Sequence, residues 1–221
     1  MPRKSFDSEI RQAKDNILVL GSMVEDSVLE AVQALYARDL LASQTILQND
    51  LQINAKRFEI EEQVMTLIAT QQPMAHDLRL LASVLEVAVE LERIGDYAKG
   101  IATLSLRIGD APLVKPIIDL PFMARKATDM LHRALGAFDA EDAETARKLP
   151  AEDDEVDDLY LQFYRVMMTY IMADPSNIDQ ATYLLWIAHN LERTADRVTN
   201  ICERTLFVVT GQIQETQGSA A

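Results

Sequence analysis

The sequence predicts an all-α protein made of two tandem, pseudo-symmetric three-helix bundles, with six long helices in all. Hydrophobic residues make up 48% of the 221 residues, whereas glycine and proline number only seven each, so turns are few and elements are long. Apolar residues recur at helical spacing through most of the chain. A charged pattern also occurs twice, as LERIGDYAKGI at 91–101 and LERTADRVTNI at 191–201, and a recurrence at such a distance indicates an internal repeat.

The first repeat is predicted to form three helices joined by short turns. Their expected bounds are 6–37, 39–71 and 75–108. Asp39 is expected to cap the second helix, because a short side-chain oxygen can accept hydrogen bonds from the free amides of a first turn. Pro73 marks the following turn. The segment 109–116 holds a glycine and two prolines and is the best linker in the chain, which divides it into domains 1–109 and 110–221.

The second repeat is predicted to follow the same scheme. Its helices are expected at 119–139, 142–173 and 178–210. Asp142 takes the capping role of Asp39, and Pro175 marks the turn before the last helix. Pro150 falls inside the middle helix and predicts a kink there, because proline removes one backbone donor. The polar tail from about residue 211 is expected to be disordered.

Composition argues against several classes of function. The formal net charge is −14, from 21 basic and 35 acidic residues, so direct binding to nucleic acid or to an anionic membrane is not expected. A cation, or a basic face of another protein, is the natural counterpart. The chain shows no signal-peptide pattern and no apolar stretch of the roughly 18 residues that a membrane span needs, which predicts a cytoplasmic protein. The single cysteine, Cys202, lies on an apolar helical stripe and is expected to be a buried, unreactive thiol.

Acidic residues recur on one face of the last helix of each repeat. Residues four apart share a helix face, so Glu92 projects with Asp96, and Glu192 projects with Asp196. If each hairpin is folded about its proline turn, acidic or amide residues of the middle helix stand level with these pairs. The first cluster is then Asp50, Asn54, Glu92 and Asp96, and the second cluster is Asp153, Asp157, Glu192 and Asp196.

Both clusters are predicted to bind metal ions. Acidic side chains on two touching helices repel one another, and a di- or trivalent cation would remove that repulsion. Hard oxygen ligands suit iron, manganese, magnesium or calcium. The first cluster has an amide, Asn54, in one corner, and weaker binding is predicted there. The alternative interpretation is a solvated acidic face that is neutralised by neighbouring arginines, namely Arg93, Arg193 and Arg197.

Taken together, these motifs resemble the PhoU family of phosphate-signalling regulators. The resemblance spans about residues 6–211 and rests on the two LER motifs, on QPMAHDLRL at 72–80, and on DLQIN and DDEVD in the two middle helices. The family's Glu/Asp-x-x-x-Asp motif and its partner motif map onto the eight residues of the two clusters. The pair Thr194–Ala195 replaces the family's common Ile-Gly without changing a ligand position.

The resemblance implies a function and a set of partners. It implies metal ions on the bundle surface, in some family members multinuclear iron clusters, so iron is the favoured ion, with manganese, magnesium, zinc and calcium as alternatives. It implies negative regulation of phosphate uptake and of the phosphate-starvation response. The protein would act as an adaptor between the ATPase of the phosphate ABC transporter and a membrane sensor kinase. A homodimer is also implied, and the metal is compatible with either a sensory or a structural role.

Two other classes of function are compatible with an acidic helical bundle. A carboxylate-bridged di-iron enzyme or ferritin-like store would use two facing Glu-x-x-His elements, and this chain contains none. A helical interaction module would use its acids only for solubility. Neither a Gly-rich phosphate loop nor a Ser/His/Asp or Cys/His set occurs, so no enzymatic activity is predicted. His189 lies three residues before Glu192, but its repeat counterpart is Val89, so the repeat does not require it as a ligand.

Overall fold

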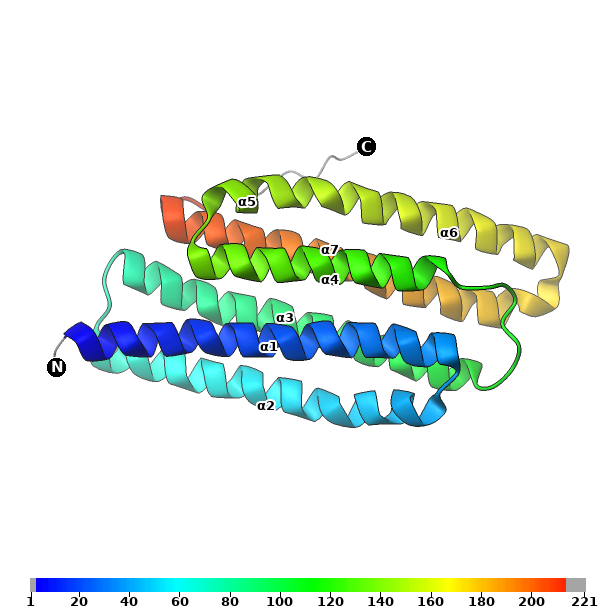
Figure 1. Cartoon of the computed structure of the whole chain (residues 1–221), viewed down its shortest axis with the longest axis horizontal. Helices are drawn as coiled ribbons and strands as arrows, with labels where there is room; N and C mark the ends of the chain where they lie inside the picture. The colour runs from blue at the N-terminus through cyan, green and yellow to red at the C-terminus, as the bar shows by residue number, and fades with distance from the viewer. Residues whose placement is uncertain (1–2, 214–221) are drawn as a thin grey trace.

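The computed structural model of the chain describes residues 3–213, which are helical almost throughout (Figure 1). The long helices are α1 (Arg3–Ala37), α2 (Leu40–Gln71), α3 (His76–Ile108), α4 (Asp119–Ala140), α6 (Asp153–Ala173) and α7 (Ile178–Thr210). A short helix α5 (Ala143–Lys148) and two 3-10 turns, η1 (Leu149–Glu152) and η2 (Pro175–Asn177), complete the described part. No strand occurs within it, which confirms the all-α class. The predicted disordered tail lies, from residue 214 onward, outside the described residues.

The helices form two groups that lie side by side, and in the second group α5 and α6 together take the place of one long helix (Figure 1). Helices α1, α2 and α3 pack against one another, and α4 and α7 pack with α5 and α6 in the second group. The groups meet where α3 lies against α7 and where α1 lies against α4. This arrangement confirms the prediction of two pseudo-symmetric three-helix bundles. No helix within residues 3–213 is both long and apolar enough to cross a membrane.

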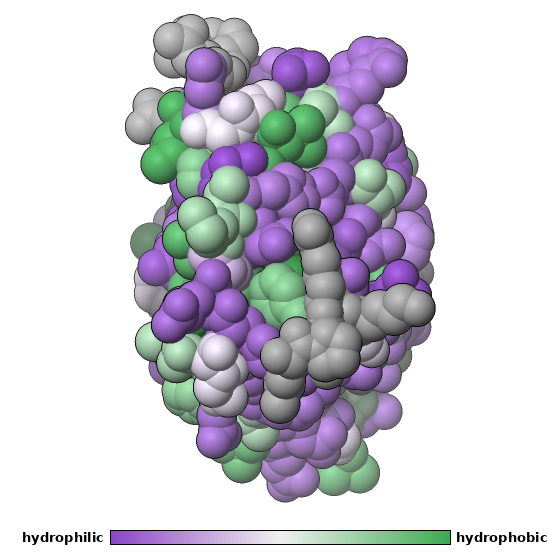
Figure 2. All heavy atoms as spheres, turned by 90° about the vertical axis from the view of Figure 1, so that its left-hand side faces the viewer, coloured by the Kyte–Doolittle hydropathy of each residue, from purple (hydrophilic) through white to green (hydrophobic). Residues whose placement is uncertain are grey.

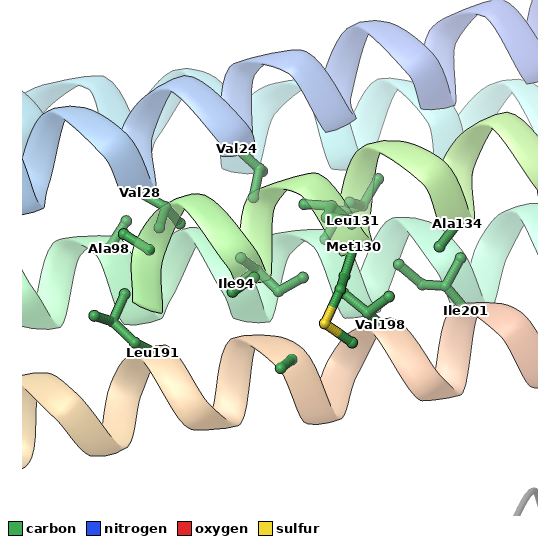
Figure 3. Packing of buried hydrophobic residues seen from close by; sticks show 14 of the residues in the cluster. Val24, Val28, Ile94, Ala98, Met130, Leu131, Ala134, Leu191, Val198 and Ile201 are labelled. Carbon is green, nitrogen blue, oxygen red and sulfur yellow. The ribbon is translucent and has the colours of Figure 1, made fainter. Parts of the chain in front are cut away.

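A single hydrophobic core runs through both groups. Figure 3 shows its middle, where side chains of α1, α3, α4 and α7 converge, among them Val28, Ile94, Met130 and Val198. All four are fully buried. Complete burial of a side chain of this size stabilises a fold by about 1.5–3 kcal/mol relative to exposure. The two groups are therefore fused along a common apolar seam, and the motif helices α3 and α7 lie at its centre.

Both predicted aspartate caps are confirmed. Asp39 Oδ1 accepts a hydrogen bond from the amide of Ala42 at 2.9 Å at the start of α2. Asp142 Oδ1 accepts from the amides of Glu144 at 2.9 Å and Thr145 at 3.2 Å at the start of α5. Each cap satisfies amides that have no partner within the helix. The two repeats thus begin their second segment by the same local chemistry.

The helix predicted at 142–173 differs from expectation in its middle. It is divided into α5, the 3-10 turn η1 and α6, and Pro150 lies in that turn. The predicted kink within a continuous helix is therefore wrong, because the helix is interrupted. Proline lacks the amide hydrogen that would close the α-helical turn, and its ring crowds a carbonyl of the preceding turn. The tighter 3-10 spacing accommodates both effects. Helix α6 therefore begins afresh at Asp153, the first residue of the second cluster.

Polar contacts join the two groups at the end of the molecule where α1 begins and α4 and α7 end. Lys14 of α1 lies 3.4 Å from the Asp139 carboxylate of α4, and His76 Nε2 lies 2.8 Å from Glu141 Oε2. Figure 2 shows this end to be mostly hydrophilic, with hydrophobic residues scattered between hydrophilic ones. Polar contacts at the rim thus supplement the apolar seam between the groups.

Candidate metal centre

Helices α3 and α7 carry the two LER motifs and run antiparallel against each other. Glu86 of α3 pairs with Arg204 of α7 at 2.8 Å. One turn further along α3, Glu90 lies 3.3 Å from Arg197 and accepts a hydrogen bond from Asn200 at 3.0 Å. The later residue of α3, Glu90, contacts earlier residues of α7 than Glu86 does, which is the order expected of antiparallel helices. The two LER motifs therefore lie against each other. The contact is an interface between the repeats, and it leaves each motif's acidic pair to face its own middle helix.

The acidic pairs do face the middle helices as the hairpin geometry predicts. Burial raises the pKa of Glu92, and the charge of Asp50 on α2 is among those that raise it further. Burial likewise raises the pKa of Glu192, with added contributions from Asp157 and Asp153 on α6. Such mutual effects require the groups to be near one another. In both clusters, the structure therefore places acids of the two helices near enough for the charge of one to act on the pKa of the other.

A lysine lies against the buried acid of the first cluster. Asp50 is buried, with 3% of its surface exposed, and its Oδ2 lies 2.6 Å from Lys99 Nζ. Asn54 Nδ2 donates to the same oxygen at 3.2 Å. Lys99 also lies 3.9 Å from Asp96 Oδ1. The hydrogen bond to Asp50 raises the pKa of Lys99, which keeps the ammonium charged.

The other acids of the first cluster lie closer to solvent. The Asp96 side chain is about half exposed. Glu92 is partly buried, and burial raises its pKa, with the charge of Asp96 as the next cause. Arg57 of α2 opposes this shift. The first cluster thus contains one buried carboxylate that is paired with a lysine and two carboxylates that lie closer to solvent.

The second cluster holds carboxylate oxygens without partners. Asp153 Oδ1, Asp157 Oδ1 and Glu192 Oε2 are each inaccessible to solvent and have no hydrogen-bond donor. Burial raises the pKa of Asp153 to about 7, and the charges of Asp196 and Asp157 add to the effect. The pKa of Glu192 is also raised to about 7, by burial first and by Asp196 next. Burying carboxylates beside one another without donors is costly unless a proton or a cation neutralises them.

The arginines and the lysine around the second cluster are engaged with other groups. Arg193 lies over the ring of Tyr97 at 4.6 Å and only partly offsets the shift at Glu192. Arg197 pairs with Glu90, and Lys126 pairs with Glu155 at 2.5 Å. In the first repeat, Arg93 likewise lies 3.5 Å from Glu90. The alternative interpretation, in which arginines neutralise the acids, therefore has little support at the second cluster.

His189 lies at the edge of the second cluster. Its Nδ1 is 3.0 Å from Glu192 Oε2, but the two groups are not aligned as a hydrogen bond. Its ring packs near that of Tyr160, with centroids 5.8 Å apart, and about half of the side chain is exposed. The histidine is thus within reach of the cluster, although the repeat-related position holds Val89.

The fit of each cluster to a metal ion can be judged from these contacts. Three unpartnered oxygens at the second cluster are the hard donors that iron, manganese, magnesium or calcium prefer. In the described part of the chain, no three acidic, histidine or cysteine side chains converge into a ready-made ligand set, so binding would require side-chain rotation. The second cluster fits an ion by its chemistry, whereas in the first cluster Lys99 already lies against the buried carboxylate.

Comparison with known proteins relates the whole chain to one family. The sequence profile of the PhoU domain matches twice, at residues 17–105 and 120–205. The phosphate-specific transport system accessory protein PhoU homolog of Clostridium acetobutylicum is 32% identical, over 96% of this chain and 97% of its own. Crystal structures of PhoU from Streptococcus pneumoniae and Pseudomonas aeruginosa superpose with TM-scores of 0.87 and 0.88, each at 31% identity. They cover 95% and 94% of this chain and 99% and 100% of their own. The chain belongs to the PhoU family of phosphate-transport accessory and regulatory proteins.

Proposed function

We propose that this protein is a metal-binding cytoplasmic regulator of phosphate uptake and of the phosphate-starvation response. Its relatives are named as accessory proteins of a phosphate-specific transport system, and the similarity covers nearly the full length of both chains. The proposed role is regulatory and not enzymatic. The protein would act as a negative regulator, as an adaptor between the phosphate transporter ATPase and a sensor kinase, and as a homodimer.

The metal-binding part of the proposal is carried by the second cluster. Asp153, Asp157, Glu192 and Asp196 would hold the ion, because three of their oxygens are buried without donors. The bound cation would supply positive charge between α6 and α7. Asp153 and Asp157 belong to α6, whereas Glu192 and Asp196 belong to α7. An ion held by both pairs would therefore fix the spacing of the two helices. Helix α7 also packs on α3, so this spacing bears on the interface between the repeats.

The metal proposal is tested by elemental analysis of the untagged protein purified without chelator. Glu192→Ala combined with Asp196→Ala should remove bound metal, because it takes away the ligands from α7. Circular dichroism of the variant shows whether the helices remain. Metal-free wild-type protein from cells grown with ample iron and manganese would count against the proposal.

The regulatory proposal is tested in cells that lack the protein. Under ample phosphate, a reporter of the phosphate-starvation response should be derepressed in the deletion strain and repressed again by the wild-type gene. Affinity capture with the full-length chain should recover the transporter ATPase and the kinase. A reporter that stays repressed after deletion would contradict negative regulation, and light scattering of the purified chain tests the homodimer.

A further inference from the structure

The two clusters differ at one position of the LER motif that the pseudo-symmetry makes comparable. The first motif ends in Lys99-Gly-Ile, and the second ends in Thr199-Asn-Ile, so Lys99 and Thr199 occupy equivalent places on α3 and α7. The position is three residues beyond the motif aspartate in both repeats. It therefore lies beside the acids and can change their charge balance without altering any ligand.

Lys99 lies against the most buried acid of the first cluster. Its ammonium is 2.6 Å from Asp50 Oδ2 and 3.9 Å from Asp96 Oδ1, so one cation reaches acids of both α2 and α3. Asn54 donates to the same Asp50 oxygen at 3.2 Å. None of the first-cluster acids has a buried oxygen without a partner, as judged over residues 3–213. The lysine bridges the two helices, as a metal ion would do.

The equivalent residue of the second repeat supplies no charge. Thr199 Oγ1 donates to the backbone carbonyl of Asp196 at 2.7 Å, within its own helix. The neighbouring arginines are engaged elsewhere, Arg193 over Tyr97 and Arg197 with Glu90. The imidazole of His189 lies 3.0 Å from Glu192 Oε2 without an aligned hydrogen bond. Asp153, Asp157 and Glu192 thus have buried oxygens without hydrogen-bond donors in the repeat that carries threonine in place of the lysine.

We propose that Lys99 is a built-in cation of the first cluster, so that metal loading of this chain is confined to the second cluster. A metal ion at the first cluster would have to displace the ammonium from Asp50 and then remain beside it, and two cations at such a distance repel. This inference rests on the proposed metal binding at the second cluster. It assigns the difference between the repeats chiefly to Lys99, whereas the sequence alone suggested Asn54.

The proposal is tested by the Mn²⁺ content of full-length chains that are stripped with chelator, reloaded with Mn²⁺ and desalted. Glu92→Ala with Asp96→Ala in the wild-type background should leave the Mn²⁺ content unchanged, because the first cluster holds none. A loss of about half of the metal would overturn the proposal. This comparison does not depend on any substitution of Lys99.

A gain-of-site series tests Lys99 itself. Lys99→Thr, which introduces the second repeat's residue, combined with Asn54→Asp should increase bound Mn²⁺ about twofold and raise the melting temperature on Mn²⁺ addition more than in wild type. Lys99→Arg is the matched control, because it keeps the charge, and it should show no gain. Asn54→Asp alone should also show none. A gain with Asn54→Asp alone, or no gain with the double substitution, would overturn the role of Lys99.

Metal binding at the second cluster and the role of Lys99 are distinguished by the Mn²⁺ content of these variants. If wild-type protein binds no Mn²⁺ but the Lys99→Thr/Asn54→Asp protein does, the proposed metal binding at the second cluster is wrong and the role of Lys99 is supported. If neither binds Mn²⁺, both are overturned. If the Glu192→Ala/Asp196→Ala protein binds no Mn²⁺ and the Glu92→Ala/Asp96→Ala protein binds as much as wild type, metal binding at the second cluster and its confinement to that cluster are both supported.

Discussion

Glu90 of α3 lies 3.3 Å from Arg197 of α7, and this ion pair joins the two repeats at the centre of the molecule. Both side chains are largely shielded from water, with 14% and 21% of their surfaces exposed. Asn200 adds a hydrogen bond to the same Glu90 oxygen at 3.0 Å. The repeat-related residue of Glu90 is Asn190, whose amide packs 3.1 Å from the position of a Cβ atom on Gly100. The interface between α3 and α7 thus has an ion pair at Glu90, whereas at the repeat-related Asn190 the side chain lies close to the backbone of Gly100.

Replacing Glu90 with alanine should destabilise the fold by about 1–3 kcal/mol, because Arg197 and Asn200 would lose their shared acceptor in a shielded site. Urea denaturation followed by circular dichroism measures the effect. Glu86→Ala is the matched control, since that residue pairs with Arg204 but is about half exposed. The control should cost less than about 1 kcal/mol. Equal losses in the two variants would contradict the importance of shielding.

The metal-free protein should lose stability as the pH rises through the range in which Asp153 and Glu192 titrate. Their pKa values are raised from 3.8 and 4.5 to about 7, so between these limits the folded state binds more protons than the unfolded state. The free energy of unfolding then falls with rising pH. Both groups are only partly buried, so after allowance for solvent screening the loss should be roughly 2 kcal/mol.

This pH effect is isolated by comparison with a variant that cannot titrate. Asp153→Asn combined with Glu192→Gln keeps the shapes of the side chains and should flatten the pH dependence between pH 4 and 7, measured in the presence of chelator. A bound cation should also flatten it in the wild type. Identical pH profiles of wild type and variant would show that the two carboxyls are not shifted.

Gly95 is coupled to Ile53 at the contact between α2 and α3. A Cβ atom on Gly95 would lie 3.1 Å from Ile53 Cγ2, whereas the second repeat has alanine at position 195 and valine at 156. Gly95→Ala should therefore be about 1 kcal/mol more favourable in an Ile53→Val background than in the wild type, because valine lacks the Cδ1 atom that would lie 3.3 Å from the new Cβ atom and its remaining methyl groups gain room to shift. A double-mutant cycle of unfolding free energies measures this coupling, and perfect additivity would refute it.

Cys202 should react with thiol reagents only when the protein unfolds. The residue is fully buried on α7, and burial raises the pKa of its thiol to about 12. The reactive thiolate is therefore scarce and inaccessible at neutral pH. Labelling with a maleimide should be slow in native protein and fast in urea. Rapid native labelling would show that α7 opens readily, and Ala195→Cys, at another buried position of α7, provides a matched comparison.

Most of the fold follows from local sequence signals. Apolar spacing located the six long helices, and Asp39 and Asp142 cap as their side chains require. Pro150 was recognised as a disruption, but its result is a 3-10 turn that separates α5 from α6. The extent of that change depends on how the surrounding segment packs against α4 and α7, which a linear pattern does not contain.

The positions of the acidic residues of the candidate site could be predicted from the sequence. The basic residues that pair with them could not. Helical spacing and hairpin folding brought Glu92 toward Asp50 and Glu192 toward Asp153, as the structure shows. Lys99 was missed as a partner of Asp50, although aligning the repeats exposes the lysine–threonine difference. Whether a lysine at that place reaches across the helix pair, or extends into water, depends on side-chain direction. Sequence spacing alone does not specify this.

The central claim is that the unpartnered oxygens of the second cluster hold a cation. It is tested most directly by equilibrium dialysis of chelator-stripped protein against Mn²⁺, with wild type beside a variant carrying Glu192→Gln and Asp196→Asn, which preserves side-chain shape and removes two charges. The wild type should retain Mn²⁺ and the variant should retain almost none. Equal retention by the two proteins, or none by the wild type, would contradict the account.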